Sequence, residues 1–239
     1  MHRLVTTEDN SVTLYVPGLN EHYHSIHGAI QESRHIFIQA GMEYFLENRP
    51  DNITAPAPLH ILEAGFGTGL NAYLTLVQAS ERQIPVHYHT IEKYPLSPDE
   101  IKYLNYPEHI DFKDKHLFEQ LHQCPWESKQ AITPCFSLCK HRTDIRDIAF
   151  SQQFDIVYFD AFSPEVQPHL WTPEVFARLH QALRPDGILV TYCVKGIVKQ
   201  ALRASGFTLK RLPGPPGKRE MLRATKILND TTNENKTEK

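Results

Sequence analysis

The sequence has no apolar stretch approaching the roughly 20 residues that a membrane-spanning helix needs. Its first residues, Met-His-Arg-Leu-Val-Thr, also lack the apolar segment of a secretory signal peptide. Cysteine is scarce, with four in 239 residues, which fits reduced thiols better than a disulfide framework. These absences argue against a membrane or secreted protein, and we expect a cytoplasmic one.

Neither sign of charge dominates the chain as a whole, because its net charge is only −3. Taken alone, this balance argues against a nucleic-acid partner. Between Lys195 and Lys226, however, nine basic residues face one acidic residue, Glu220, which gives +8 there and leaves −11 for the rest. A local positive field suffices for phosphate contacts. The same residues also fit the solvated faces of a helix and an edge strand, so charge leaves both interpretations open.

Short apolar runs that are typical of buried strands alternate with helix-like segments from residue 59 onward. We expect strands at 59–64, 86–92, 136–141, 154–160, 187–194, 207–212 and 221–226, and helices at 70–80 and 197–205. The Pro-Gly-Pro-Pro-Gly loop at 213–217 is too short for a helical crossover, so the last two strands should pair antiparallel. A mostly parallel seven-stranded sheet with an antiparallel last strand predicts the α/β, Rossmann-like fold of class I methyltransferases.

The length suits one elaborated domain. We expect it to span residues 51–228, with an insertion at 95–135 that adds helices at the edge of the sheet. Residues 1–50 form an N-terminal extension with a strand at 12–16 and a helix at 32–47. The polar segment 229–239 is predicted to be a disordered tail.

A glycine-rich motif joins the first strand to the first helix of this domain, Ile-Leu-Glu-Ala-Gly-Phe-Gly-Thr-Gly-Leu-Asn at 61–71. Glycines let the backbone turn sharply and approach a ligand beside the positive end of a helix. Leu70 stands where the dinucleotide fingerprint needs glycine, so the motif fits S-adenosylmethionine better than NAD. The predicted cofactor contacts in this motif are Glu63, Gly65, Gly67, Gly69 and Asn71.

Acidic residues follow the next two strands. Glu92 ends the second strand, where a carboxylate can accept hydrogen bonds from both ribose hydroxyls. Asp144 follows the third strand and is a candidate for the adenine amino group. Each residue also has a purely structural interpretation, Glu92 as an ordinary acid at a strand end and Asp144 as the cap of the turn at 145–147.

The fourth strand ends at Asp160, two residues before Phe162. Ligands of open α/β sheets bind at the carboxyl ends of the strands, so both side chains should face the transferred methyl group. An alkyl amine with a pKa of roughly 10 is mostly ammonium at neutral pH. Asp160 can bind that ammonium, orient it and help to pass its proton to water, which makes it the predicted catalytic residue. The alternative is a structural acid bonded to a loop.

Five potential zinc ligands also occur, at His122, Cys124, Cys135, Cys139 and His141. Their spacing matches no standard zinc module, and the last two fall in a predicted strand. We therefore expect no metal.

Several segments together carry a family resemblance. They are residues 63–71, 91–97, 160–164, 168–172 and 218–222, with Glu-Ser-Arg at 32–34 after Tyr-His-Ser at 23–25. From about Tyr23 to Lys226 the chain resembles the methyltransferase domain of the MnmC family, bacterial enzymes that complete 5-methylaminomethyl-2-thiouridine in tRNA. The resemblance implies methyl transfer from S-adenosylmethionine to the exocyclic nitrogen of 5-aminomethyl-(2-thio)uridine at the wobble position.

The resemblance also implies further roles. Lys93 joins the cofactor site, and the extension at 1–50 covers cofactor and substrate. Expected substrate contacts with the tRNA anticodon loop are Tyr23, Ser25, Phe162, Trp171, Lys218 and Arg219. Among these, Phe162 and Trp171 are candidates to stack on an unpaired base, and the two basic residues to bind phosphates. Trp171 also fits local packing.

The chain departs from bifunctional members in two ways. No oxidase domain follows residue 226, so we expect a monomer whose aminomethyl substrate is made by separate enzymes. Lys195 stands where the family has a small residue. Two alternatives remain: a small-molecule amine methyltransferase or aminopropyltransferase of the same fold, and a non-catalytic binding module. The intact glycine motif argues against the second.

Overall fold

The computed structural model describes residues 2–49 and 57–227. The strands are β1 (Arg3–Thr6), β2 (Val12–Val16), β3 (Glu21–His22), β4 (Leu59–Ala64), β5 (Val86–Ile91), β6 (Lys129–Thr133), β7 (Phe136–His141), β8 (Phe154–Phe159), β9 (Leu183–Thr191), β10 (Phe207–Pro213) and β11 (Glu220–Lys226). The helices are α1 (Ala29–Ser33), η1 (Arg34–Glu43), α2 (Tyr44–Glu47), α3 (Leu70–Arg82), α4 (Pro98–Ile101), α5 (Tyr106–His109), α6 (His116–Gln123), η2 (Ile145–Asp147), η3 (Pro168–Leu170), α7 (Pro173–Ala182) and α8 (Gly196–Ala204). The predicted tail at 229–239 lies outside the described residues.

The large sheet has the strand order β10-β11-β9-β8-β4-β5-β7-β6. Strands β9, β8, β4, β5 and β7 run parallel, and β11 pairs antiparallel with both β9 and β10. This arrangement confirms the predicted Rossmann-like α/β fold with an antiparallel last strand.

The strand count differs from the prediction. An eighth strand, β6, lies within the insertion and pairs antiparallel with β7 at the sheet edge. Sequence reasoning missed it because its five residues, Lys-Gln-Ala-Ile-Thr, include only one well-buried apolar side chain, Ile132. The insertion also carries α4, α5 and α6, so the helices expected there are present.

The fifth long strand begins at Leu183 and not at 187. Helix α7 ends at Ala182, and residues 184–187 form an irregularity in the pairing of β9 with β8, where Asp186 has a φ of 60°. The Arg-Pro-Asp-Gly segment therefore forms a bulge inside the strand.

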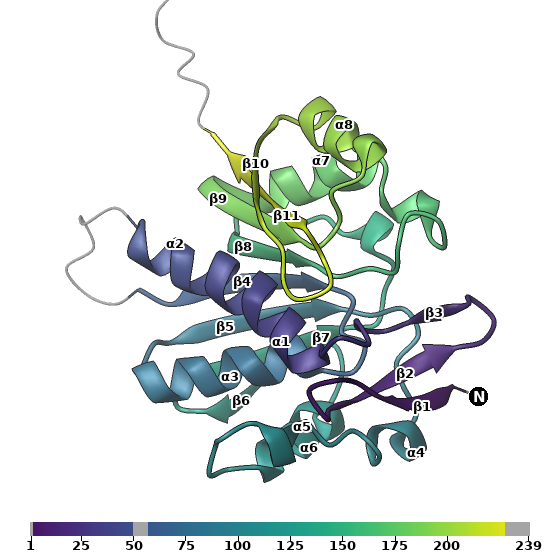
Figure 1. Cartoon of the computed structure of the whole chain (residues 1–239). Coiled ribbons are helices and arrows are strands. Elements are labelled where there is room, and N and C mark those ends of the chain that lie inside the picture. The colour runs from purple at the N-terminus through teal and green to yellow at the C-terminus, as the bar shows by residue number, and fades with distance from the viewer. Residues whose placement is uncertain (1, 50–56, 228–239) are drawn as a thin grey trace, which may run out of the picture.

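Helices cover both faces of the sheet (Figure 1). The continuous helix formed by α1, η1 and α2 packs with α3 on one face, around Phe37, Tyr88 and Tyr158, and α7 and α8 cover part of the other. Gly41 allows the long helix to lie close to the sheet, because a Cβ there would come within 3.2 Å of the Tyr158 ring. The small sheet of β1, β2 and β3 stands beside this layered core (Figure 1).

Candidate active site

A cavity of about 780 Å³ opens where the parallel strands end. Its wall combines the loops after β4, β5, β7 and β8 with the N-terminal extension and the β10–β11 connection. A volume of this size is within the usual range for cofactor sites, and the position is the one that open α/β sheets use for ligands. Two distant parts of the chain thus close a pocket that the central sheet alone would leave open.

The glycine motif forms the floor of the cavity. Gly65 has a φ of 96°, and a Cβ at this residue would approach the Asp160 carbonyl oxygen to 2.8 Å. Gly67 has a φ of 50°, and its missing Cβ leaves room for the ring of Tyr23, which would otherwise lie 3.0 Å away. Both glycines are required because an L side chain would be strained and would fill the space in which the backbone faces the cavity.

Two predicted cofactor contacts in this motif do not line the cavity. Glu63 is fully buried beneath the loop, and its Oε2 accepts a 2.6 Å hydrogen bond from Thr90. Burial raises the pKa of the Glu63 carboxyl well above its usual value. Gly69 is the N-cap residue of α3, and a Cβ there would come within 2.8 Å of His122 Nε2. Both residues therefore shape the loop, and neither is among the residues that line the cavity in this structure.

Glu92 and the glycine loop hold each other in position. One carboxylate oxygen accepts a hydrogen bond from the Gly67 N–H at 3.1 Å, and the other accepts one from the Tyr94 N–H at 2.8 Å. A carboxylate has about four acceptor positions. Glu92 lines the cavity and retains acceptor capacity toward it.

Asp144 lies in the same wall but is already surrounded by donors. Arg146 donates to it from its backbone N–H and twice from its guanidinium, and Lys93 Nζ adds a bond of 3.0 Å. These donors hold the pKa of the Asp144 carboxyl far below its usual range, with the Arg146 side chain as the largest cause. The predicted cap of η2 is confirmed. An adenine amino group can bond to Asp144 only if one of these cations moves.

Asp160 stands at the centre of the cavity wall, directly after β8. Its Oδ2 accepts a 2.8 Å hydrogen bond from Asn71 Nδ2, which lies on the first turn of α3. Burial raises the pKa of the Asp160 carboxyl to about 7, and the nearby Glu32 carboxylate acts in the same direction, whereas Asn71 and Lys218 lower it. A half-buried carboxyl that titrates near neutrality beside a ligand-sized cavity is suited to accepting a proton.

The extension contributes Tyr23 and Ser25 to the cavity wall, as predicted. The ring of Tyr23 packs edge-on against Phe162 with centroids 4.9 Å apart. The Ser25 side chain is not the group that anchors this segment, because its backbone N–H donates to Glu32 at 2.7 Å. This bond ties the extension to the first helix at the cavity.

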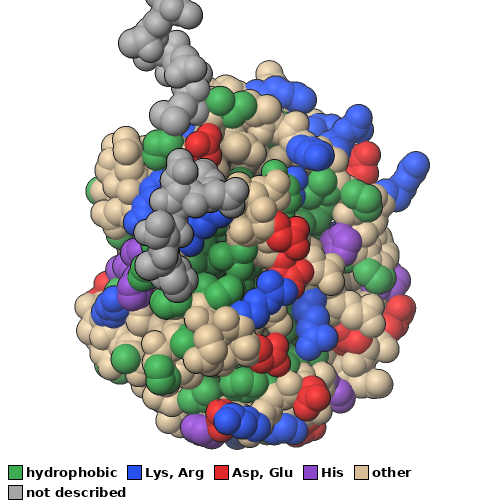
Figure 2. Space-filling model, turned by 90° about the vertical axis from the view of Figure 1, so that its left-hand side faces the viewer, with side chains coloured by type: hydrophobic (Ala, Val, Ile, Leu, Met, Phe, Trp, Pro, Cys, Tyr) green, Lys and Arg blue, Asp and Glu red, His purple; other side chains and the backbone are tan. Residues whose placement is uncertain are grey.

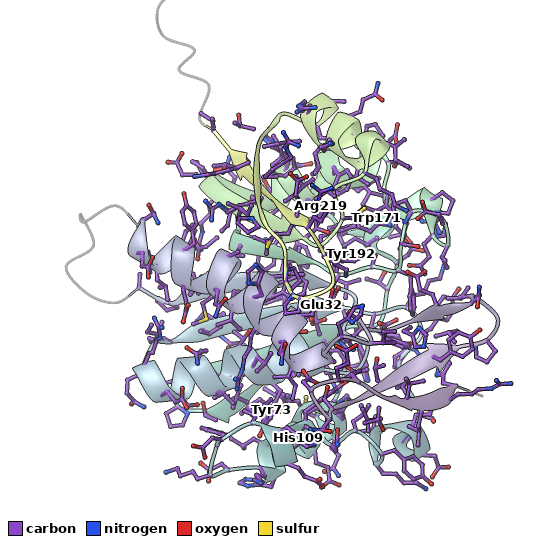
Figure 3. All side chains as sticks on the ribbon, viewed as in Figure 1. Glu32, Tyr73, His109, Trp171, Tyr192 and Arg219 are labelled. Carbon is purple, nitrogen blue, oxygen red and sulfur yellow. The ribbon has the colours of Figure 1, made fainter. Side chains whose placement is uncertain are left out.

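Glu32 and Tyr192 are cavity residues that sequence reasoning did not select. Lys218 forms an ion pair with Glu32, and the Nζ of Lys218 lies 4.2 Å from the centre of the Tyr192 ring. Figure 3 shows Glu32 and Tyr192 beside the β10–β11 connection. Tyr192 follows β9 directly, so the strand-end rule that selected Asp160 also indicates this residue.

Trp171 and Lys218 need corrected roles. Trp171 is 3 % exposed, packs against Phe159, and donates from Nε1 to the Phe162 carbonyl at 2.8 Å, so no face of its ring is free for a base. Lys218 points into the cavity toward Glu32 and not outward toward phosphates. Arg219, by contrast, is exposed on the β10–β11 connection (Figure 3).

The basic C-terminal segment is partly engaged inside the fold. Arg223 lies over the Tyr44 ring, and Lys226 donates to two backbone carbonyls. Lys195, the residue that departs from the family pattern, is exposed and pairs with Glu165. In the parts of the chain that the structure describes, the basic residues of this segment without an ion pair or internal partner are Lys199, Arg203, Lys210 and Arg219. The face in Figure 2 likewise intersperses basic and acidic side chains.

Comparisons with known proteins agree with this geometry. A family model described as S-adenosyl-L-methionine-dependent methyltransferase matches residues 116–227. The fold and the site place the chain in the class of Rossmann-like, S-adenosylmethionine-dependent methyltransferases. The described residues contain no helix long and apolar enough to cross a membrane.

The more specific similarity is to MnmC. The tRNA 5-methylaminomethyl-2-thiouridine biosynthesis bifunctional protein MnmC of Pseudomonas syringae pv. tomato is 31 % identical over 218 residues, which cover 86 % of this chain and 32 % of that protein. The MnmC of Leptospira borgpetersenii serovar Hardjo-bovis is 30 % identical, over 89 % of this chain and 33 % of its own length. This chain thus spans about a third of the length of these curated relatives.

A solved structure extends the match to the fold. The crystal structure of MNMC2 from Aquifex aeolicus superposes with a TM-score of 0.75 at 26 % identity, over 94 % of this chain and 70 % of that one. The predicted resemblance to the MnmC methyltransferase domain is confirmed.

Proposed function

We propose that this protein transfers the methyl group of S-adenosylmethionine to the exocyclic amine of 5-aminomethyl-(2-thio)uridine at the wobble position of tRNA. The observation that carries the proposal is the Asp160 carboxyl, which faces a ligand-sized cavity beside the glycine loop. The names of the MnmC relatives supply the substrate class. Such a substrate is found in the cytoplasm, where we expect the enzyme to act as a monomer.

The chain offers a site that fits the cofactor. When bound, S-adenosylmethionine supplies an electrophilic methyl group on a sulfonium. Gly65 and Gly67 give it backbone room, because a Cβ at either residue would collide with its neighbours. Glu92 accepts hydrogen bonds from the ribose hydroxyls with its remaining lone pairs. Lys93 and Asp144 form the wall at the adenine end as an ion pair.

Asp160 acts on the amine. Its carboxylate would bind the substrate ammonium and accept one proton from it, which leaves the nitrogen lone pair free, and bound S-adenosylmethionine would supply the methyl electrophile. Asn71 donates a hydrogen bond to one oxygen of the Asp160 carboxylate and so fixes the orientation of that group. The other carboxylate oxygen is then positioned to hold the amine for in-line attack. Phe162 and Tyr23 give the pocket an aromatic wall for the uracil ring, and base stacking of this kind is how proteins hold unpaired RNA bases.

The test is a transfer reaction with purified protein. Undermodified tRNA that carries aminomethyluridine is incubated with S-adenosylmethionine bearing a labelled methyl group, and its nucleosides are separated by mass spectrometry. We expect label in methylaminomethyluridine, and an initial rate of labelling about a thousandfold lower with Asp160→Asn at neutral pH. Label that appears only in small amines, with none in tRNA, would favour the small-molecule alternative.

The phosphate contacts need a separate test, because Lys218 is engaged inside the cavity. We propose that Arg219 and Lys210 supply contacts in its place, since both are exposed on β10 and its connection. Each lost phosphate contact should weaken tRNA binding and reduce the slope of log Kd against log salt concentration by about one. Arg211→Ala is the matched control, because Arg211 already pairs with Glu220. An unchanged salt slope in Arg219→Ala and Lys210→Ala would contradict this assignment.

A further inference from the structure

Three metal-binding side chains meet on the sheet face that α7 and α8 leave partly uncovered. His89 on β5 and Cys139 on β7 are direct register partners, and His141 follows two residues later on the same face of β7. Each offers one ligand atom, and the three atoms all lie within 4.8 Å of one another. This grouping arises from strand pairing and was not selected from the sequence, where the residue pattern gave no zinc module.

The distances suit a small divalent ion. His89 Nδ1 and His141 Nε2 are 3.0 Å apart. Zinc bonds of about 2.0–2.1 Å to nitrogen and 2.3 Å to sulfur, in tetrahedral geometry, place neighbouring ligand atoms roughly 3.3–3.6 Å apart. The observed separations, 3.0 Å between the two ring nitrogens and at most 4.8 Å among all three atoms, bracket these values, so side-chain shifts bring the two imidazoles and the thiol to coordinating positions.

A second layer of contacts orients His141. Its Nδ1 lies 3.5 Å from Glu127 Oε2, while Glu127 Oε1 accepts a 2.6 Å hydrogen bond from the Arg142 N–H. A carboxylate beside the far nitrogen of a histidine favours the tautomer with the proton on Nδ1 and the lone pair on Nε2. This tautomer is the one that a metal bound at Nε2 requires.

Aromatic side chains surround the cluster. Phe150 packs against His89 and His141, and Phe154 packs against His89, which limits solvent at the cluster. Cys139 is 8 % exposed and forms no disulfide.

We propose that His89, Cys139 and His141 form a binding site for one divalent transition-metal ion of the zinc class. The choice of metal follows from the donors, because two imidazoles and one thiolate suit Zn²⁺ and Co²⁺ and not Mg²⁺ or Ca²⁺. On binding, the Cys139 thiol loses its proton to solvent and a metal–sulfur bond forms. The proton that His89 Nδ1 donates to His141 Nε2 moves through solvent to His89 Nε2, and two metal–nitrogen bonds replace the hydrogen bond between the two histidines. The bound ion would connect β5 to β7 just before Glu92 and Asp144.

Cobalt titration of the untagged full chain, after chelator treatment, tests the site. We expect one equivalent of Co²⁺ to bind with a thiolate-to-cobalt charge-transfer band, and Zn²⁺ to displace it. Cys139→Ser should lose the band, and His89→Gln should weaken binding. Cys135→Ser is the matched control, because Cys135 lies outside the cluster, and it should keep both the band and the stoichiometry.

Glu127→Gln keeps the test decisive if a strand variant fails to fold, since Glu127 is largely exposed. It should retain the band while the Co²⁺ affinity falls by about 10-fold to 100-fold, as for other outer-layer carboxylates. Wild-type protein without a thiolate band, or a band that survives Cys139→Ser and disappears in Cys135→Ser, would overturn the proposal. The readout is metal binding, so its result is independent of methyl transfer.

Discussion

Replacing Asp160 with asparagine should change the shape of the pH–rate profile as well as its height. The wild-type carboxyl titrates near pH 7, because burial raises its pKa to about that value. If Asp160 takes the proton from a bound ammonium, kcat/KM for tRNA requires ionised Asp160 and protonated amine. It should therefore rise about tenfold per pH unit below pH 7, level off, and fall again near the amine pKa of roughly 10.

The variant has no group to take that proton, so only amine that is already neutral can react. With a pKa of roughly 10, about one amine in a thousand is neutral at pH 7. Asp160→Asn should thus lose about a thousandfold in kcat/KM at pH 7, within the usual range for a general base, and regain roughly tenfold per pH unit up to the amine pKa.

The assay is methyl transfer to undermodified tRNA from pH 5.5 to 9.5, with Asp147→Asn as the control because Asp147 is exposed and outside the cavity. The profile is plotted as kcat/KM because this quantity reports the pKa values of the free enzyme. The profile of kcat reports those of the complex, in which the positive charge of the bound cofactor shifts the carboxyl pKa. A variant that keeps the wild-type limb near pH 7, or whose loss is equal at every pH, would refute the role of Asp160 as proton acceptor.

Three further outcomes follow from the structure. Glu92→Ala should raise the calorimetric Kd for S-adenosylhomocysteine with little change in kcat, and the reverse pattern would remove it from the ribose site. Trp171→Ala should lower the free energy of unfolding in urea by about 3–5 kcal/mol, because a buried aromatic is deleted, and an unchanged stability with weaker tRNA binding would contradict its burial. Glu63→Gln should become more stable relative to wild type as pH rises from 5 to 7, by up to about 1.4 kcal/mol per pH unit. The reason is that burial raises the pKa of Glu63, so the folded wild type keeps a proton that its unfolded chain loses above the ordinary pKa, and wild-type stability falls as pH rises. Parallel stability curves would show that Glu63 is ionised in the fold.

Much of the sheet could be predicted because its strands are short, apolar and buried on both faces, and because the loop at 213–217 permits only an antiparallel return. The strand-end rule likewise placed Asp160 and Glu92 at one cavity, since parallel strands bring their carboxyl ends together. Local pattern and topology carry this part of the information.

Other site residues depend on contacts that no local pattern encodes. Lys218 and Glu32 are 186 positions apart, and only the folded chain shows that they pair within the cavity. The sequence left Trp171 open between base stacking and local packing, and only the fold shows that its indole N–H bonds to a backbone carbonyl and that its ring is buried. The grouping of His89 with Cys139 requires the register of β5 on β7, which spacing along the chain does not specify.

A crystal structure of the protein with S-adenosylhomocysteine tests the central claim most directly. The ligand should occupy the cavity, with its ribose hydroxyls on Glu92 and its sulfur facing the Asp160 carboxylate across the space for the substrate amine. A ligand bound at another place, or bound in the cavity with its sulfur directed away from Asp160, would contradict the account.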